Sequence, residues 1–82
     1  MISEEVVVRG TTGLHLAGDL CREAKKFRSS ITIDYKDNTA NAKSVLSVIA
    51  TGMEQGEAVT LICEGPDEKE AAEEIRKVLE RI

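Results

Sequence analysis

The hydrophobic residues of this chain follow two different spacings, and the spacing switches repeatedly within 82 residues. Between residues 31 and 35 every second residue is apolar, which is typical of a β-strand with one buried face. Between residues 17 and 27 the apolar residues are separated by steps of one or three positions, as on one face of an α-helix: Ala17, Leu20, Cys21, Ala24 and Phe27. A chain of this length has room for one core, so we expect one domain over residues 1–82.

The same criteria give the order of the elements along the chain. Strands are predicted at 2–9, 31–36 and 58–63, and a short return strand follows an Asp37-Asn38 turn. Helices are predicted from 17 to 27 and from 66 to the end. Residues 44–52 fit a strand or a short helix, and Ser44 as N-cap with Gly52 as terminator favours the helix. The β-α-β-β-α-β-α order predicts an α+β fold, an open-faced β-sandwich whose four-stranded antiparallel sheet has three helices on one face.

The composition excludes several classes of protein. The net charge is −4 and the chain has one Phe and one Tyr, so we expect no nucleic-acid partner, because such surfaces need clustered cations and stacking rings. No apolar run approaches the roughly 20 residues of a membrane-spanning helix, so no membrane insertion is expected. The opening MISEEVVVRG lacks the basic and long apolar regions of a signal peptide, which predicts a cytoplasmic location.

The two cysteines lie within apolar patterns rather than in a paired motif. Cys21 and Cys63 are therefore interpreted as small core residues, with a disulfide between them as the alternative. One histidine and two distant cysteines offer no cluster of metal ligands, so we expect neither a metal nor another cofactor.

The segment TTGLHLAGDL contains the only histidine of the chain, His15, just ahead of the predicted helix. Free N–H groups and the positive end of a helix dipole favour an anion at such a place. A neutral imidazole can attack phosphorus at pH 7, so a transient phosphohistidine is chemically reasonable. Its oxygens would be held by the Thr12 hydroxyl and by the N–H groups of Leu16 and Ala17. A structural role for a lone histidine, and a turn role for Thr12, are the commoner alternatives.

Four short motifs occur in order across nearly the whole chain: TGLH at 12–15, NAKS at 41–44, MEQGE at 53–57 and EGPDE at 64–68. Together they resemble the HPr family, the histidine-containing phosphocarrier proteins of the bacterial sugar phosphotransferase system. The resemblance implies the fold predicted above. It also implies that His15 accepts a phosphoryl group from the phosphoenolpyruvate-dependent enzyme I and passes it to sugar-specific enzyme II components.

The resemblance further implies a regulatory site and a docking site. Ser44 matches the serine at the start of the short second helix through which the family is regulated, which adds a serine kinase to the implied partners. Val45, Leu46 and Ile49 would then form an exposed apolar patch for partner proteins. For each of these three residues, an ordinary place in the helix core is the alternative interpretation.

The sequence departs from the family directly after His15. The family continues as x-Arg-Pro, whereas this chain has Leu16-Ala17-Gly18, and matching the apolar helix stripe to the family's buried face requires two missing residues. The Arg-Pro pair is thus interpreted as deleted. The arginine would have contributed about 1.5–3 kcal/mol per charge-assisted hydrogen bond to a phosphoryl group. Losing two residues also rotates the histidine by roughly 200° of helical register. Arg9 and Arg22 are the candidate cations for compensation.

Three hypotheses of function follow. The first is an HPr-like phosphocarrier that uses His15. The second is an HPr-like interaction or regulatory module that has lost efficient phosphotransfer and acts by binding partner proteins. An enzyme in its own right is the least favoured, because the chain shows no second base beside the histidine and no complete catalytic set.

Overall fold

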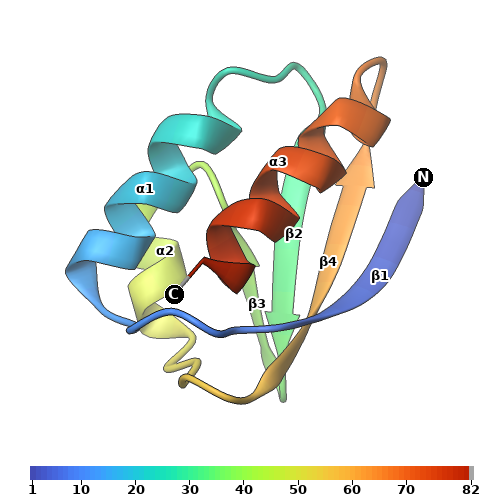
Figure 1. Cartoon of the computed structure of the whole chain (residues 1–82). Helices are drawn as coiled ribbons and strands as arrows, with labels where there is room; N and C mark the ends of the chain where they lie inside the picture. The colour runs from blue at the N-terminus through green and yellow to red at the C-terminus, as the bar shows by residue number, and fades with distance from the viewer. Residues whose placement is uncertain (82) are drawn as a thin grey trace.

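The computed structural model describes residues 1–81, which form four strands and three helices (Figure 1). The elements are β1 (Ile2–Val7), α1 (Leu14–Ala24), β2 (Ser30–Tyr35), β3 (Asn38–Asn41), α2 (Val45–Ala50), β4 (Ala58–Glu64) and α3 (Glu68–Glu80). The predicted β-α-β-β-α-β-α order is confirmed.

The strands form one antiparallel sheet in the order β1-β4-β2-β3. Ile33 lies opposite Leu61 of β4 and Ala40 of β3, and all three side chains are buried on the same face. The alternating residues of β2 and β4 point to the other face and are exposed or half-buried. This period of two is what the sequence predicted for these strands.

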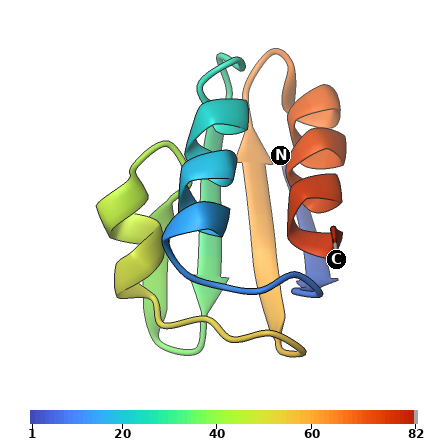
Figure 2. The same ribbon diagram turned by 60° about the vertical axis from the view of Figure 1, so that its left-hand side comes forward.

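All three helices cover the same face of the sheet, and the opposite face is left open (Figure 2). α3 packs on β1 and β4, α2 packs on β3, and α1 lies between α2 and α3. The predicted open-faced sandwich is therefore confirmed. The core between sheet and helices is built from aliphatic residues, of which the largest fully buried ones are Leu20, Ile31, Ile33, Leu61, Ile75 and Leu79.

Several element boundaries differ from the predicted ones: β1, for example, ends at Val7 rather than Arg9, and α1 ends at Ala24 rather than Phe27. α1 begins at Leu14 rather than Ala17, because Gly13 and not a later residue provides the non-helical N-cap. The hairpin turn consists of Lys36 and Asp37, one position earlier than predicted, and Lys36 takes a left-handed φ of 54°. Pro66 lies before α3, whose N-cap is Asp67.

Asp67 ties the start of α3 to the loop between α1 and β2. Its carboxylate accepts hydrogen bonds from the backbone N–H groups of Arg28 and Ser29, both at 2.9 Å, and from the buried Ser29 hydroxyl at 2.5 Å. The Ser29 hydroxyl, with the two N–H groups, lowers the pKa of Asp67 from 3.8 to about 2. One carboxylate thus holds together two segments that lie 38 residues apart.

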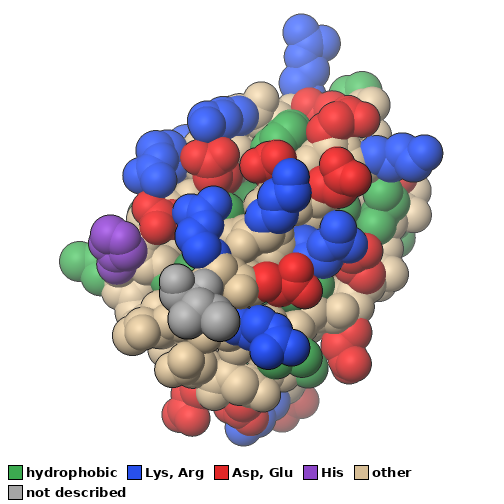
Figure 3. Space-filling model, in the orientation of Figure 1, with side chains coloured by type: hydrophobic (Ala, Val, Ile, Leu, Met, Phe, Trp, Pro, Cys, Tyr) green, Lys and Arg blue, Asp and Glu red, His purple; other side chains and the backbone are tan. Residues whose placement is uncertain are grey.

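Basic and acidic side chains are interspersed over the helix-covered side of the molecule (Figure 3). The purple histidine stands out at one edge of this view. Within residues 1–81, no helix is long and apolar enough to cross a membrane.

Candidate functional site

The start of α1 carries N–H groups that no side chain caps. Gly13 occupies the N-cap with φ 124° and ψ −159°, a backbone conformation that is essentially restricted to glycine. In the part of the chain that the structure describes, no side chain bonds to this cap. The Ala17 N–H donates to the Gly13 carbonyl oxygen at 3.0 Å, which leaves the preceding N–H groups of the first turn, including that of Leu16, for an anion.

This arrangement corrects the prediction for Ala17. We expected its N–H group to be free to hold a phosphoryl oxygen, but the helix begins three residues earlier than predicted. The Ala17 N–H is consequently the first to take an intrahelical partner.

His15 is the second residue of α1, and its side chain is 95% exposed. The imidazole therefore lies in solvent in a chain that has Leu16-Ala17-Gly18 after the histidine. The next two residues, Leu16 and Ala17, are buried and fix the helix against the core. The ring thus projects from a well-anchored first turn rather than from a loop.

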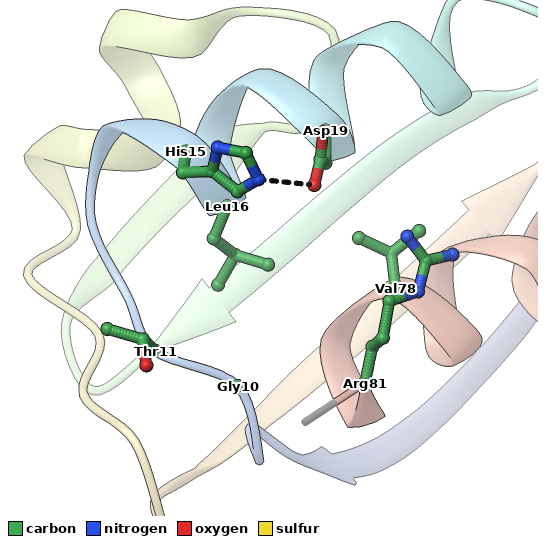
Figure 4. A pocket seen from close by; sticks show the side chains of 7 residues that line it. All are labelled: Gly10, Thr11, His15, Leu16, Asp19, Val78 and Arg81. Carbon is green, nitrogen blue, oxygen red and sulfur yellow. Dashed lines mark ion pairs between the residues drawn. The ribbon is translucent and has the colours of Figure 1, made fainter.

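Asp19 lies one helical turn after His15 and approaches the imidazole ring. Its Oδ2 is 3.6 Å from His15 Nε2, and the ring's other nitrogen points away from the carboxylate (Figure 4). Arg22 donates from Nη2 to the second oxygen, Asp19 Oδ1, at 2.8 Å. Sequence reasoning missed Asp19. The i, i+4 spacing from His15 could have revealed it, but only with the helix starting at Leu14.

A hollow of about 250 Å³ lies beside His15, between the start of α1 and the end of α3. Its wall on the α1 side includes His15, Leu16 and Asp19, and its wall on the α3 side includes Arg81 (Figure 4). Gly10 also lines the hollow, and a β-carbon at this position would collide with the Arg81 carbonyl oxygen. No local pattern connects Arg81, 66 positions after His15, with the histidine.

The other predicted site residues near His15 lie elsewhere. Thr11 rather than Thr12 lines the hollow beside His15, whereas Thr12 lines a neighbouring hollow of about 270 Å³ that faces α2. Arg9 does not line either hollow, and its backbone is bonded to Leu79 and Gln55. Arg22 is close to the ring, but it is bonded to Asp19.

The predicted docking patch is divided between surface and core. Leu46 and Ile49 of α2 are 80% and 43% exposed, whereas Val45 is half-buried and packs against the core. Leu14, which the sequence reasoning missed, is 71% exposed at the start of α1. We refer to Leu14, Leu46 and Ile49 as the apolar surface.

Ser44 is the N-cap of α2, as predicted. Its hydroxyl oxygen accepts a hydrogen bond from the Ser47 N–H at 3.3 Å, and the helix ends before Gly52, which has a left-handed φ of 71°. Both signals that favoured a helix over a strand for this segment are therefore used.

The two cysteines are buried and not disulfide-bonded. Burial raises the pKa of the Cys63 thiol to about 11, which keeps it protonated and unreactive. The prediction that both are core residues is confirmed. Within residues 1–81, no three His, Cys, Asp or Glu side chains form a group that could hold a metal ion.

Comparisons with known proteins point to one family. A family model described as "PTS HPr component phosphorylation site" matches residues 2–81. The Phosphocarrier protein HPr of Buchnera aphidicola subsp. Acyrthosiphon pisum (strain APS) is 38% identical over 81 residues, which are 96% of this chain and 95% of the relative.

Solved structures agree with this match. The crystal structure of HPr-C-His from Thermoanaerobacter tengcongensis has a TM-score of 0.90 and 32% identity, and covers 98% of this chain and 92% of that one. That of a Phosphocarrier Protein HPr from Bacillus anthracis str. Ames has a TM-score of 0.89 and 29% identity, with 95% of each chain covered. Family match, sequence identity and fold coincide over nearly the full length, and the chain belongs to the HPr family.

Proposed function

We propose that this chain is an HPr-like phosphocarrier of the phosphotransferase system and that His15 accepts and donates the phosphoryl group. The observation that carries the proposal is the place of the imidazole, fully accessible in the first turn of α1 in a chain of this family. A nucleophile that exchanges a group with two successive proteins has to be exposed, and the only histidine of the chain is.

The chemistry follows from the end of the helix. The imidazole lone pair forms a bond to phosphorus while the bond from phosphorus to the donor breaks and its electron pair leaves with the donor. The phosphoryl oxygens then meet the free N–H groups of the first turn, of which the Leu16 N–H is one. These N–H groups would hold the phosphoryl oxygens without the hydrogen bonds that an arginine after the histidine would have added. We assign no phosphate contact to Arg22, because its guanidinium already bonds to Asp19.

The partners follow from the carrier role. We propose that enzyme I supplies the phosphoryl group in the cytoplasm and that sugar-specific enzyme II components receive it. The apolar surface is the proposed docking site for these proteins, and Ser44 at the start of α2 is the proposed position for a serine kinase. The alternative of an interaction module without phosphotransfer is not favoured, because the relatives are named phosphocarrier proteins.

The experiment is phosphorylation with phosphoenolpyruvate and enzyme I, followed by mass spectrometry of the intact protein. We expect the mass of one phosphoryl group, lost on treatment with acid, and we expect none in His15→Ala. An HPr of known activity in the same tube serves as the control. An unmodified mass for this chain, in a tube where the control HPr is phosphorylated, would contradict the proposal.

A further inference from the structure

We propose that Asp19 is a positioning residue for His15. Its carboxylate keeps a proton on Nε2, so that the opposite ring nitrogen, Nδ1, carries the lone pair that makes and releases the bond to phosphorus. This inference rests on the proposed function, since it concerns the same imidazole. The i, i+4 pair of His15 and Asp19 on one helix face is its structural basis.

The carboxylate is held more firmly than the ring. Asp19 is only 20% exposed, and Arg22 donates to its Oδ1 at 2.8 Å, which leaves Oδ2 directed at the imidazole. The gap of 3.6 Å between His15 Nε2 and Asp19 Oδ2 is longer than a hydrogen bond. A rotation of the exposed ring that shortens it by less than ~1 Å makes one. Arg22 therefore fixes the acceptor, and the ring adjusts to it.

A neutral imidazole has one N–H group and one lone pair. With the proton on Nε2, the Nδ1 lone pair forms the new bond to phosphorus while the donor's bond to phosphorus breaks and its electron pair returns to the donor. In the second transfer the P–Nδ1 bond breaks and its electron pair returns to Nδ1. Because Nε2 keeps its proton, the leaving group is a neutral imidazole and not an anion, which favours departure.

Asp19 also has the right charge environment. Two hollows within residues 1–81 have His15 in their walls: the one of about 250 Å³ described above, and one of about 530 Å³ lined by Leu14, His15, Gly18, Asp19 and Arg22. Asp19 is the one carboxylate among their lining residues, which also include the cations Arg22 of α1 and Arg81, directly after α3. The bond to Arg22 compensates the negative charge of Asp19. The carboxylate can therefore orient the ring from the Nε2 side without strongly repelling a phosphoryl group on the Nδ1 side.

The first test uses the unphosphorylated protein, so it does not depend on any transfer reaction. Nitrogen-15 NMR of the His15 ring measures the ratio of the two neutral tautomers. We expect the share of the tautomer protonated on Nε2, relative to the other, to fall by about twofold in Asp19→Ala, as for the loss of one i, i+4 pair. Asp19→Glu should restore it.

Glu23→Ala is the matched control for this measurement. Glu23 lies on the same helix and also pairs with Arg22, at 3.7 Å, and with Lys26, so its loss removes the same charge without touching the ring. A tautomer ratio that is unchanged in Asp19→Ala, or that changes equally in Glu23→Ala, would overturn the inference.

The second test uses protein phosphorylated chemically with phosphoramidate, which requires no partner enzyme. The rate of phosphoryl loss is measured against pH. We expect loss to be slower in Asp19→Ala than in the unchanged chain, because a leaving imidazole that keeps its proton on Nε2 departs as a neutral group. The same pH profile in both proteins would also overturn the inference. If enzyme I does not phosphorylate the chain but both of these tests give the expected results, the proposed function is contradicted and the role of Asp19 is not.

Discussion

Gly13 determines how α1 begins and therefore where His15 projects. Its φ of 124° and ψ of −159° lie in a region that side chains rarely enter, although the space around a β-carbon there is open. The cost of a side chain at this position is thus one of backbone conformation and not of collision. Gly18, inside the same helix, also has open space but an ordinary helical backbone.

These two glycines give opposite predictions for the same substitution. Gly13→Ala should lower the free energy of unfolding by about 1–3 kcal/mol, because alanine is strained at that φ. Gly18→Ala should raise it by about 0.5–1 kcal/mol, because alanine is the better helix former. Urea denaturation of both variants measures the difference. Equal effects of the two changes would show that the first turn of α1 does not require the observed Gly13 conformation.

The histidine itself was predictable from the sequence, but its surroundings were not. The TGLH motif identified His15, whereas the contact with Asp19 depends on where α1 begins. Apolar spacing locates the buried stripe from Ala17 onward and contains no information about two exposed residues that precede it. Thr12 does not line the hollow beside His15, and the sequence could not show this for a similar reason. The hydrophobic pattern does not determine the path of a glycine-containing loop.

Helix α2 exposes two of the three residues of the apolar surface, Leu46 and Ile49, at little cost to the fold. Leu46 contributes little buried area to the core, because it is 80% exposed, whereas Val48 of the same helix is buried and holds α2 in place. Two roles are therefore carried by neighbouring residues of one short helix.

Leu46→Glu should abolish binding to enzyme I while changing the unfolding free energy by less than ~0.5 kcal/mol. Ser44→Asp should weaken binding as well, because it adds a negative charge beside the apolar surface and yet keeps an acceptor at the N-cap, where Asp is favoured. Titration calorimetry measures binding and urea denaturation measures stability. Glu73→Ala on α3, a change remote from α2, is the control, and unaltered binding by Leu46→Glu would exclude this docking site.

Only the residues that flank α2, Ser44 and Gly52, allowed it to be predicted as a helix. Its apolar residues fit a strand equally well, and the N-cap and the terminal glycine decided between them. The boundary of α3 was displaced because Asp67 serves as the N-cap while its side chain bonds to a distant loop. A contact between segments this far apart has no signature in local sequence.

The hydrogen bonds of Asp67 connect the start of α3 to the loop between α1 and β2, so they affect the stability of the whole molecule. The pKa of this carboxyl is lowered from 3.8 to about 2 by the Ser29 hydroxyl and the two backbone N–H groups. A group whose pKa is depressed in the folded state contributes stability that is fully present above its unfolded pKa. That contribution is lost as the pH falls through the folded pKa.

Asp67→Asn should therefore be less stable than the unchanged chain at pH 7, and the difference should shrink as the pH falls from about 4 to about 2. Urea denaturation at several pH values within this range measures it. Asp37→Asn, which removes the same charge from an exposed turn, should show no such convergence. A stability difference that is the same at every pH would mean that the Asp67 bonds do not depend on its ionisation.

The fold as a whole was more predictable than its site. Strand and helix order follow from hydrophobic periods that many residues share, so one displaced boundary leaves the sheet and the helix layer unchanged. The hollow beside His15 depends instead on single contacts between the two ends of the chain, including that of Gly10 with Arg81.

That contact has an evolutionary consequence. A single methyl group at residue 10 would collide with the carbonyl oxygen of Arg81, directly after α3, so the distance between the two walls of the hollow depends on the absence of a side chain at Gly10. Substitution of Gly10 should therefore be selected against, although this residue has no proposed contact with phosphate or partner. Residues on the uncovered face of the sheet should be free to vary.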